Sequence, residues 1–127
     1  MNNDIKILVI DDEEDFRQLM KMWLESKGYS VVTAPDGATG IQMVKSEKPG
    51  IVFVDLRMPG MDGSETISGI RSFDKRVPII IISSYVSDLK MKEVISAGIS
   101  GVFYKDQDFE KGSALLDAAL RTHKKLK

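Results

Sequence analysis

The sequence predicts an α/β fold built around a parallel sheet, and three observations support this prediction. Five short apolar runs suited to strands alternate with amphipathic stretches suited to helices, which is the pattern of a parallel α/β sheet. The runs at residues 5–10, 51–54 and 79–82 are almost wholly apolar, as expected of strands that are covered on both faces. A length of 127 residues, 43% of them apolar, fits one domain over residues 1–127 with a core of its own.

The first strand and the first helix are the most clearly marked elements. The strand occupies residues 5–10, and the acidic Glu13, Glu14 and Asp15 that follow favour the positive N-terminal end of a helix. Gly28 is well placed to end this helix. Its apolar stripe has the spacing i, i+3, i+4, i+7 and i+8 and is formed by Phe16, Leu19, Met20, Trp23 and Leu24.

The remaining elements continue the alternation. The other predicted strands lie at residues 31–34, 51–54, 79–82 and 102–104. The other predicted helices lie at residues 38–45, 64–73 and 89–97 and around residues 115–120. The turn at Asp36-Gly37 precedes the second helix, Pro49 follows it, and Gly98 ends the fourth.

Composition excludes several classes of function. A formal net charge of -1 argues against a dedicated nucleic-acid surface. With no cysteine, the chain has no disulfide, thiol nucleophile or thiolate metal site, and the lone His123 cannot form a histidine metal site by itself. No signal sequence and no apolar run of membrane-spanning length is present, so we expect a soluble cytoplasmic protein.

Acidic residues follow two of the predicted strands directly. Asp11 and Asp12 come after the first strand, and Asp55 comes after the third, followed by the loop sequence LRMPGMDG. In a parallel sheet, ligands bind beyond the carboxyl ends of the strands, so these acids should meet in one crevice. Three nearby carboxylates raise one another's pKa, and a divalent cation would relieve this repulsion. The plainer alternatives are that the acid pair caps the first helix and that Asp55 is a solvated loop residue.

Two further polar residues complete a pattern that belongs to a known family. Ser83 follows the fourth strand, and Lys105 follows the fifth. Together with Asp11-Asp12 and Asp55, in this order and near this spacing, they make the whole chain resemble a receiver domain of bacterial two-component response regulators. The resemblance implies a flavodoxin-like three-layer sandwich with strand order 2-1-3-4-5 and five helices. Alternation of strands and helices alone does not fix that order.

The resemblance also implies a role for each acid. Asp55 would accept a phosphoryl group from a sensor histidine kinase or a phosphotransfer protein, because carboxylates can form aspartyl phosphates. The cofactor would be Mg²⁺, which prefers oxygen ligands. Asp12, Asp55 and the backbone carbonyl of Arg57 would contact the ion directly, with Asp11 acting mostly through water.

Lys105 and Ser83 are assigned by the same resemblance. Lys105 would pair with Asp55 and later with the phosphoryl oxygens, where neutralising charge assists the transfer. Ser83 would be the switch hydroxyl, since it directly follows the strand and lies 22 residues before Lys105, whereas Ser84 is one residue further along. A surface lysine and a turn-forming serine are the plainer alternatives.

The implied function is a phosphorylation-activated signalling switch and not an enzyme, apart from self-catalysed phosphoryl acceptance and slow autodephosphorylation. Its readout would be the face of the fourth helix, fifth strand and fifth helix, presented to a downstream protein or to an output domain outside this chain. The resemblance leaves room for a homodimer that forms on phosphorylation, and it implies no direct contact with nucleic acid or membrane. Arg57 and Tyr85 would flank the path of a hydrolytic water, which predicts a long-lived phosphorylated state.

Two positions depart from the family pattern. Asp106 follows Lys105 where the family usually has a proline in a cis peptide, and such a bond costs about 2.5–4 kcal/mol before other residues. Val102 stands where the family usually has its switch aromatic, and alternation places Phe103 on the opposite face, which argues against an aromatic flip.

Two rival functions are less consistent with the residues present. A haloacid-dehalogenase-type phosphatase also forms an aspartyl phosphate but needs a second aspartate where Arg57 stands. A flavodoxin-like FMN-binding module needs a phosphate loop after the first strand, where the acidic run at residues 11–15 would repel a phosphate.

Overall fold

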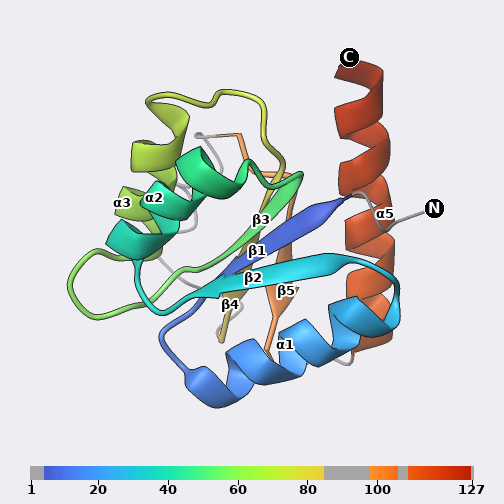
Figure 1. Cartoon of the computed structure of the whole chain (residues 1–127), viewed down its shortest axis with the longest axis horizontal. Coiled ribbons are helices and arrows are strands. Elements are labelled where there is room, and N and C mark those ends of the chain that lie inside the picture. Colours follow the sequence, from blue (N-terminus) through green and yellow to red (C-terminus); the bar gives the residue numbers. More distant parts are fainter. Residues whose placement is uncertain (1–4, 85–97, 106–108, 127) are drawn as a thin grey trace.

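Five parallel strands form one sheet with helices on both faces (Figure 1). A computed structural model describes residues 5–84, 98–105 and 109–126. The strands are β1 (Lys6–Ile10), β2 (Ser30–Ala34), β3 (Ile51–Asp55), β4 (Ile79–Ser83) and β5 (Gly101–Tyr104). Their order in the sheet is β2-β1-β3-β4-β5, which confirms the order implied by the family resemblance.

The described helices lie close to their predicted positions. They are α1 (Glu14–Ser26), α2 (Gly37–Glu47), α3 (Gly63–Arg71) and α5 (Phe109–Leu126). The fourth predicted helix, residues 89–97, lies outside the described residues. Within the described part of the chain, no helix is long and apolar enough to cross a bilayer.

The central strands divide their side chains between two hydrophobic layers, as the alternation along a strand requires. Leu8 and Ile10 of β1 belong to the layer under α2 and α3, whereas Ile7 and Val9 belong to the layer under α1 and α5. All four of these side chains are fully buried. The sheet is therefore the middle layer of a three-layer sandwich, as predicted.

The predicted stripe of α1 is wrong at Leu19. Met20 and Leu24 are fully buried, and Phe16 and Trp23 pack against the same layer, but the Leu19 side chain is 51% exposed. Neighbouring positions on a helix are about 100° apart, so Leu19 lies on the margin of the stripe when Met20 points into the core. The apolar stripe of α1 is thus wider than the face of the helix that the sheet covers.

The loop from β3 to α3 is fixed by its last residues. Asp62 caps α3 by accepting the Glu65 N–H, and the Glu65 side chain in turn accepts the Asp62 N–H, which is a capping box. A Cβ atom on Gly63 would lie 2.5 Å from the Asp55 carbonyl oxygen and 2.6 Å from Leu56 Cα. The chain therefore needs glycine at position 63 to bring α3 against the end of β3, and the helix starts one residue earlier than predicted.

Candidate functional site

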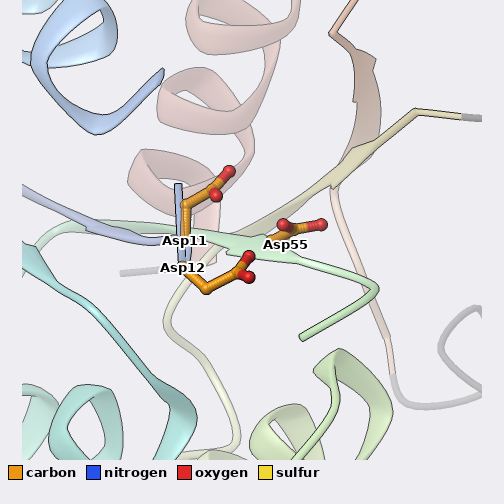
Figure 2. Close-up of side chains that lie close together, drawn as sticks. All are labelled: Asp11, Asp12 and Asp55. Carbon is orange, nitrogen blue, oxygen red and sulfur yellow. The ribbon is translucent and has the colours of Figure 1, made fainter. Parts of the chain in front are cut away.

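The predicted site residues converge at the carboxyl ends of four strands. Asp11 and Asp12 follow β1, Asp55 ends β3, Ser83 ends β4, and Lys105 follows β5. The parallel registers of these strands bring the four ends to the same edge of the sheet. Figure 2 shows the side chains of Asp11, Asp12 and Asp55 close together at the ends of β1 and β3.

The three carboxylates form a compact cluster. One oxygen from each of Asp11, Asp12 and Asp55 lies within 4.8 Å of the others. Asp11 is fully buried and Asp55 is 4% exposed, whereas Asp12 is exposed to solvent. Two of the carboxylates are held by the backbone, because Asp11 Oδ1 accepts the Glu13 N–H at 2.8 Å and Asp55 Oδ1 accepts the Arg57 N–H at 3.2 Å.

Lys105 extends its ammonium group into this cluster. Its Nζ lies 3.3 Å from Asp55 Oδ2 and 3.1 Å from Asp11 Oδ2, and its side chain is 14% exposed. The same ammonium forms an ion pair with Glu13 and lies 4.9 Å from the centre of the Phe16 ring. The predicted contact with Asp55 is present in the structure, but Lys105 also contacts two other carboxylates.

The contacts of Glu13 and Phe16 were not predicted from the sequence. The sequence pattern identifies Glu13 only as a helix-terminal charge and Phe16 only as part of the apolar stripe. Their positions directly after the acid pair, three residues apart on the first turn of α1, are the signal that would have placed both beside the site.

Burial and mutual repulsion make the acids reluctant to ionise. Burial, together with the charge of Asp11, raises the pKa of Asp55 from 3.8 to about 7, even though Lys105 and the Arg57 N–H oppose this. Burial also raises the pKa of Asp11. For Lys105, burial opposes the charged form, but the hydrogen bond to Glu13 and the charges of Asp11 and Asp55 outweigh it and raise the pKa. One ammonium therefore does not fully compensate the buried acids.

These properties fit a hard divalent cation. The donors are carboxylate oxygens, which suit Mg²⁺ better than softer metals. The buried Asp11 Oδ2 accepts no hydrogen bond from the described residues, although it lies near the Lys105 ammonium. That ammonium, 3.1 Å from Asp11 Oδ2, is shared with Asp55 and Glu13, so one positive charge serves three carboxylates. Asp11, Asp12 and Asp55 thus offer a site for Mg²⁺.

Ser83 is 2% exposed at the end of β4, and its carbonyl oxygen accepts the Lys105 N–H at 2.9 Å. The backbone thus links the two residues directly across the β4–β5 pair, while Ser84 is exposed. Arg57 is also exposed, and Tyr85 and the residue after Lys105 lie outside the described residues.

The sequence was compared with families of known proteins. The family described as the response regulator receiver domain matches residues 7–117. The chain belongs to this family. Receiver domains are the regulated modules of two-component response regulators, and they bind Mg²⁺ at an acidic pocket and interact with histidine kinases.

Individual relatives agree with this assignment to the receiver domains. Chemotaxis protein CheY of Halobacterium salinarum is 34% identical over 110 residues, which are 87% of this chain and 90% of CheY. Transcriptional regulatory protein ZraR of Klebsiella oxytoca is 31% identical over 116 residues, which are 91% of this chain but 26% of ZraR. The chain thus spans about a quarter of the length of this regulator. These relatives are a transcriptional regulatory protein and a chemotaxis protein.

Solved structures of receiver domains have the same fold. Chemotaxis protein CheY4 of Vibrio cholerae aligns with a TM-score of 0.85 at 29% identity, covering 91% of this chain and 98% of CheY4. The BeF3-activated receiver domain of Klebsiella pneumoniae RstA aligns with a TM-score of 0.84 at 27% identity, with the same coverage. The architecture predicted from the sequence is therefore that of a receiver domain.

Proposed function

We propose that this receiver domain is a phosphorylation-activated switch in which Asp55 accepts the phosphoryl group. The observation that carries the proposal is the setting of Asp55: it is buried at the end of β3, it lies 3.3 Å from the Lys105 ammonium, and two further acids adjoin it. A buried carboxylate beside a cation and a candidate metal site has the surroundings that phosphoryl transfer requires. Asp12, Asp55 and the Arg57 carbonyl would hold Mg²⁺ directly, and Asp11 through water.

In the transfer step, a carboxylate oxygen of Asp55 attacks the phosphorus atom of a phosphohistidine on a partner histidine kinase or phosphotransfer protein. A bond forms between this oxygen and phosphorus, the bond from phosphorus to the imidazole nitrogen breaks, and its electron pair stays on the nitrogen. The Arg57 N–H holds Asp55 Oδ1 and so fixes the orientation of the nucleophile. Bound Mg²⁺ neutralises negative charge on the acids and on the phosphoryl oxygens.

Lys105 serves the transfer in two ways. Its proximity favours the ionised, nucleophilic form of Asp55, and its ammonium can follow the charge onto the phosphoryl oxygens. A charged hydrogen bond contributes roughly 1.5–3 kcal/mol, and 1.4 kcal/mol is a tenfold change in population. The free energy of the hydrogen bonds that Lys105 and the Ser83 hydroxyl would form with the phosphoryl group is thus large enough to shift an equilibrium between two conformations.

The route to the output face begins at the β4–β5 pair. The Lys105 N–H donates to the Ser83 carbonyl, so a movement of either residue displaces the end of β5. Val102 packs on the α2–α3 side of the sheet and Phe103 is fully buried on the α1–α5 side, as alternation predicts. We therefore assign the change at the face of the fourth helix, β5 and α5 to movement of Ser83 and Lys105 and not to a rotating aromatic side chain. That face would act on a downstream protein, an output domain or a second copy of the chain.

The proposal is tested by incubating the chain with acetyl phosphate and Mg²⁺ and measuring its intact mass. The wild type should gain one phosphoryl group, and Asp55→Asn should gain none. Asp36→Asn is the matched control: it removes a carboxylate from the exposed N-cap of α2, where asparagine caps equally well. Undiminished phosphorylation of Asp55→Asn would refute the assignment of Asp55.

A further inference from the structure

Lys105 is shared between the interior of the site and its rim. Inside the site its ammonium contacts Asp11 and Asp55, which are both almost fully buried. At the rim it contacts Glu13, whose side chain is 61% exposed. The ammonium therefore divides its charge between two buried acids and one exposed acid at the rim.

Glu13 stands at a position where another residue type would serve the helix better. It is the N-cap of α1, yet its side chain forms no capping hydrogen bond. Serine, threonine, aspartate or asparagine there would accept such a bond, a difference of about 0.5–2 kcal/mol. The negative charge of Glu13 suits the positive end of α1, but a capping role does not explain where its side chain lies. The ion pair with Lys105 explains that position.

The Phe16 ring also helps to hold the Lys105 ammonium beside Glu13. Phe16 lies in the first turn of α1, three residues after the N-cap Glu13, and its ring centre is 4.9 Å from the Lys105 ammonium. A cation over an aromatic face is attracted by the ring. Glu13 and Phe16 together form a seat on α1 for the charged end of a side chain that comes from β5.

We propose that Glu13 is a positioning residue that competes with Asp55 for the Lys105 ammonium and so limits the rate of phosphorylation. This inference rests on the proposed function, because it concerns the cation that serves the transfer to Asp55. A negative charge on the phosphoryl group draws Lys105 inward only after the pair with Glu13 has separated. Loss of that pair leaves the ammonium with the buried acids and shortens the path to the reacting oxygens.

The test uses Glu13→Gln, Glu13→Asp and Glu14→Gln in the full chain, with acetyl phosphate at saturating Mg²⁺. Glu13→Gln removes the ion pair, and Glu13→Asp keeps the charge but shortens the reach. Glu14→Gln removes the same charge from an exposed neighbour. We expect the phosphorylation rate constant at saturating donor to rise two- to fivefold in both Glu13 variants, because this ratio corresponds to the free energy of an exposed ion pair. The rate constant of Glu14→Gln should stay unchanged.

A rise in Glu13→Gln and Glu14→Gln alike, without one in Glu13→Asp, would mean that general charge near the site is responsible, and it would overturn the inference. Equal rates in all four proteins would overturn it as well. The second readout does not depend on phosphorylation: nuclear Overhauser contacts between the Lys105 Hε protons and the Phe16 ring should weaken in both Glu13 variants. If the wild type takes up no phosphate, the proposed function fails, whereas the weakened contacts would still identify the resting seat.

Discussion

Charged side chains are arranged differently at the amino and carboxyl ends of the strands. At the amino end of β1, Lys6 pairs with Glu47 at 2.7 Å, one cation to one anion, and both side chains are about one-third exposed. At the carboxyl end, the ammonium of Lys105 contacts three carboxylates, and two of these are buried. Elementary electrostatics favours the first arrangement for stability, since exposed pairs avoid desolvation.

This difference in charge arrangement indicates that the carboxyl edge is the less stable of the two. Backbone hydrogen bonds close loops at both edges, such as the Gly50 N–H to the Lys6 carbonyl at 2.8 Å and the Lys105 N–H to the Ser83 carbonyl at 2.9 Å. The carboxyl edge also holds two buried carboxylates, Asp11 and Asp55, which share the single ammonium of Lys105. Buried, incompletely matched charge is characteristic of sites that bind ligands or react. The comparison thus assigns structure to one edge and chemistry to the other.

The largest expected effect is on the phosphorylation rate when the two edge lysines are compared. Lys105→Met should slow phosphorylation by acetyl phosphate about 100-fold, the size seen when one group that stabilises developing charge is removed. Lys6→Met removes the same charge at the opposite edge and should leave the rate unchanged. Stopped-flow or mass-spectrometric time courses measure both. Equal slowing by the two substitutions would mean that net charge, and not position, matters.

The next effect concerns Mg²⁺ binding, measured by titration calorimetry. Asp12→Ala should weaken the apparent affinity at least tenfold, because a directly coordinating oxygen is lost. Glu47→Ala removes an acid at the opposite edge and should give the wild-type isotherm. An unchanged isotherm for Asp12→Ala would mean that Asp11 and Asp12 serve only to begin α1 and that Asp12 does not bind the metal.

The smallest effect concerns the lifetime of the phosphorylated state. Replacing Arg57 by asparagine and Tyr85 by alanine should accelerate phosphate loss a few-fold, since a carboxamide can orient the attacking water and the approach becomes open. Dephosphorylation after removal of the donor measures this rate. If the double variant loses phosphate at the wild-type rate or more slowly, shielding by these side chains is refuted.

Several features of the site could be predicted from the sequence for a physical reason. Parallel strands end at one edge, so polar residues that directly follow apolar runs must meet there, as Asp11, Asp55 and Lys105 do. The order of the strands was not available from periodicity, because alternation of strands and helices is compatible with several orders. It rested on the family resemblance.

The rest depends on contacts between residues far apart in the chain. The local pattern places Glu13 beside the site, but it does not identify Lys105, 92 residues away, as its partner. The exposure of Leu19 depends on how α1 rotates over the sheet, which a stripe of five apolar residues leaves undetermined. The start of α3 at Gly63 depends on close packing against Leu56, which composition does not show.

The stability of the metal-free chain as a function of pH tests the central claim that the carboxyl edge holds uncompensated charge. Because the pKa of Asp55 is raised from 3.8 to about 7, the folded state retains this proton to higher pH than the unfolded state. The contribution of Asp55 therefore favours folding below about pH 4 and is lost as pH rises toward 7. Asp55→Asn removes the ionisable group, so the stability of this variant should not decrease for this reason as pH rises.

The decisive measurement is chemical unfolding of wild type and Asp55→Asn from pH 4 to pH 8, with and without Mg²⁺. Without metal, Asp55→Asn should become more stable than wild type as pH rises, by on the order of 4 kcal/mol at pH 8, since the pKa of Asp55 is raised from 3.8 to about 7 and one pKa unit corresponds to about 1.4 kcal/mol. Saturating Mg²⁺ should stabilise the wild type and narrow this difference. A difference between the two proteins that does not vary with pH, or a wild type that is the more stable protein at pH 8 without metal, would contradict the account.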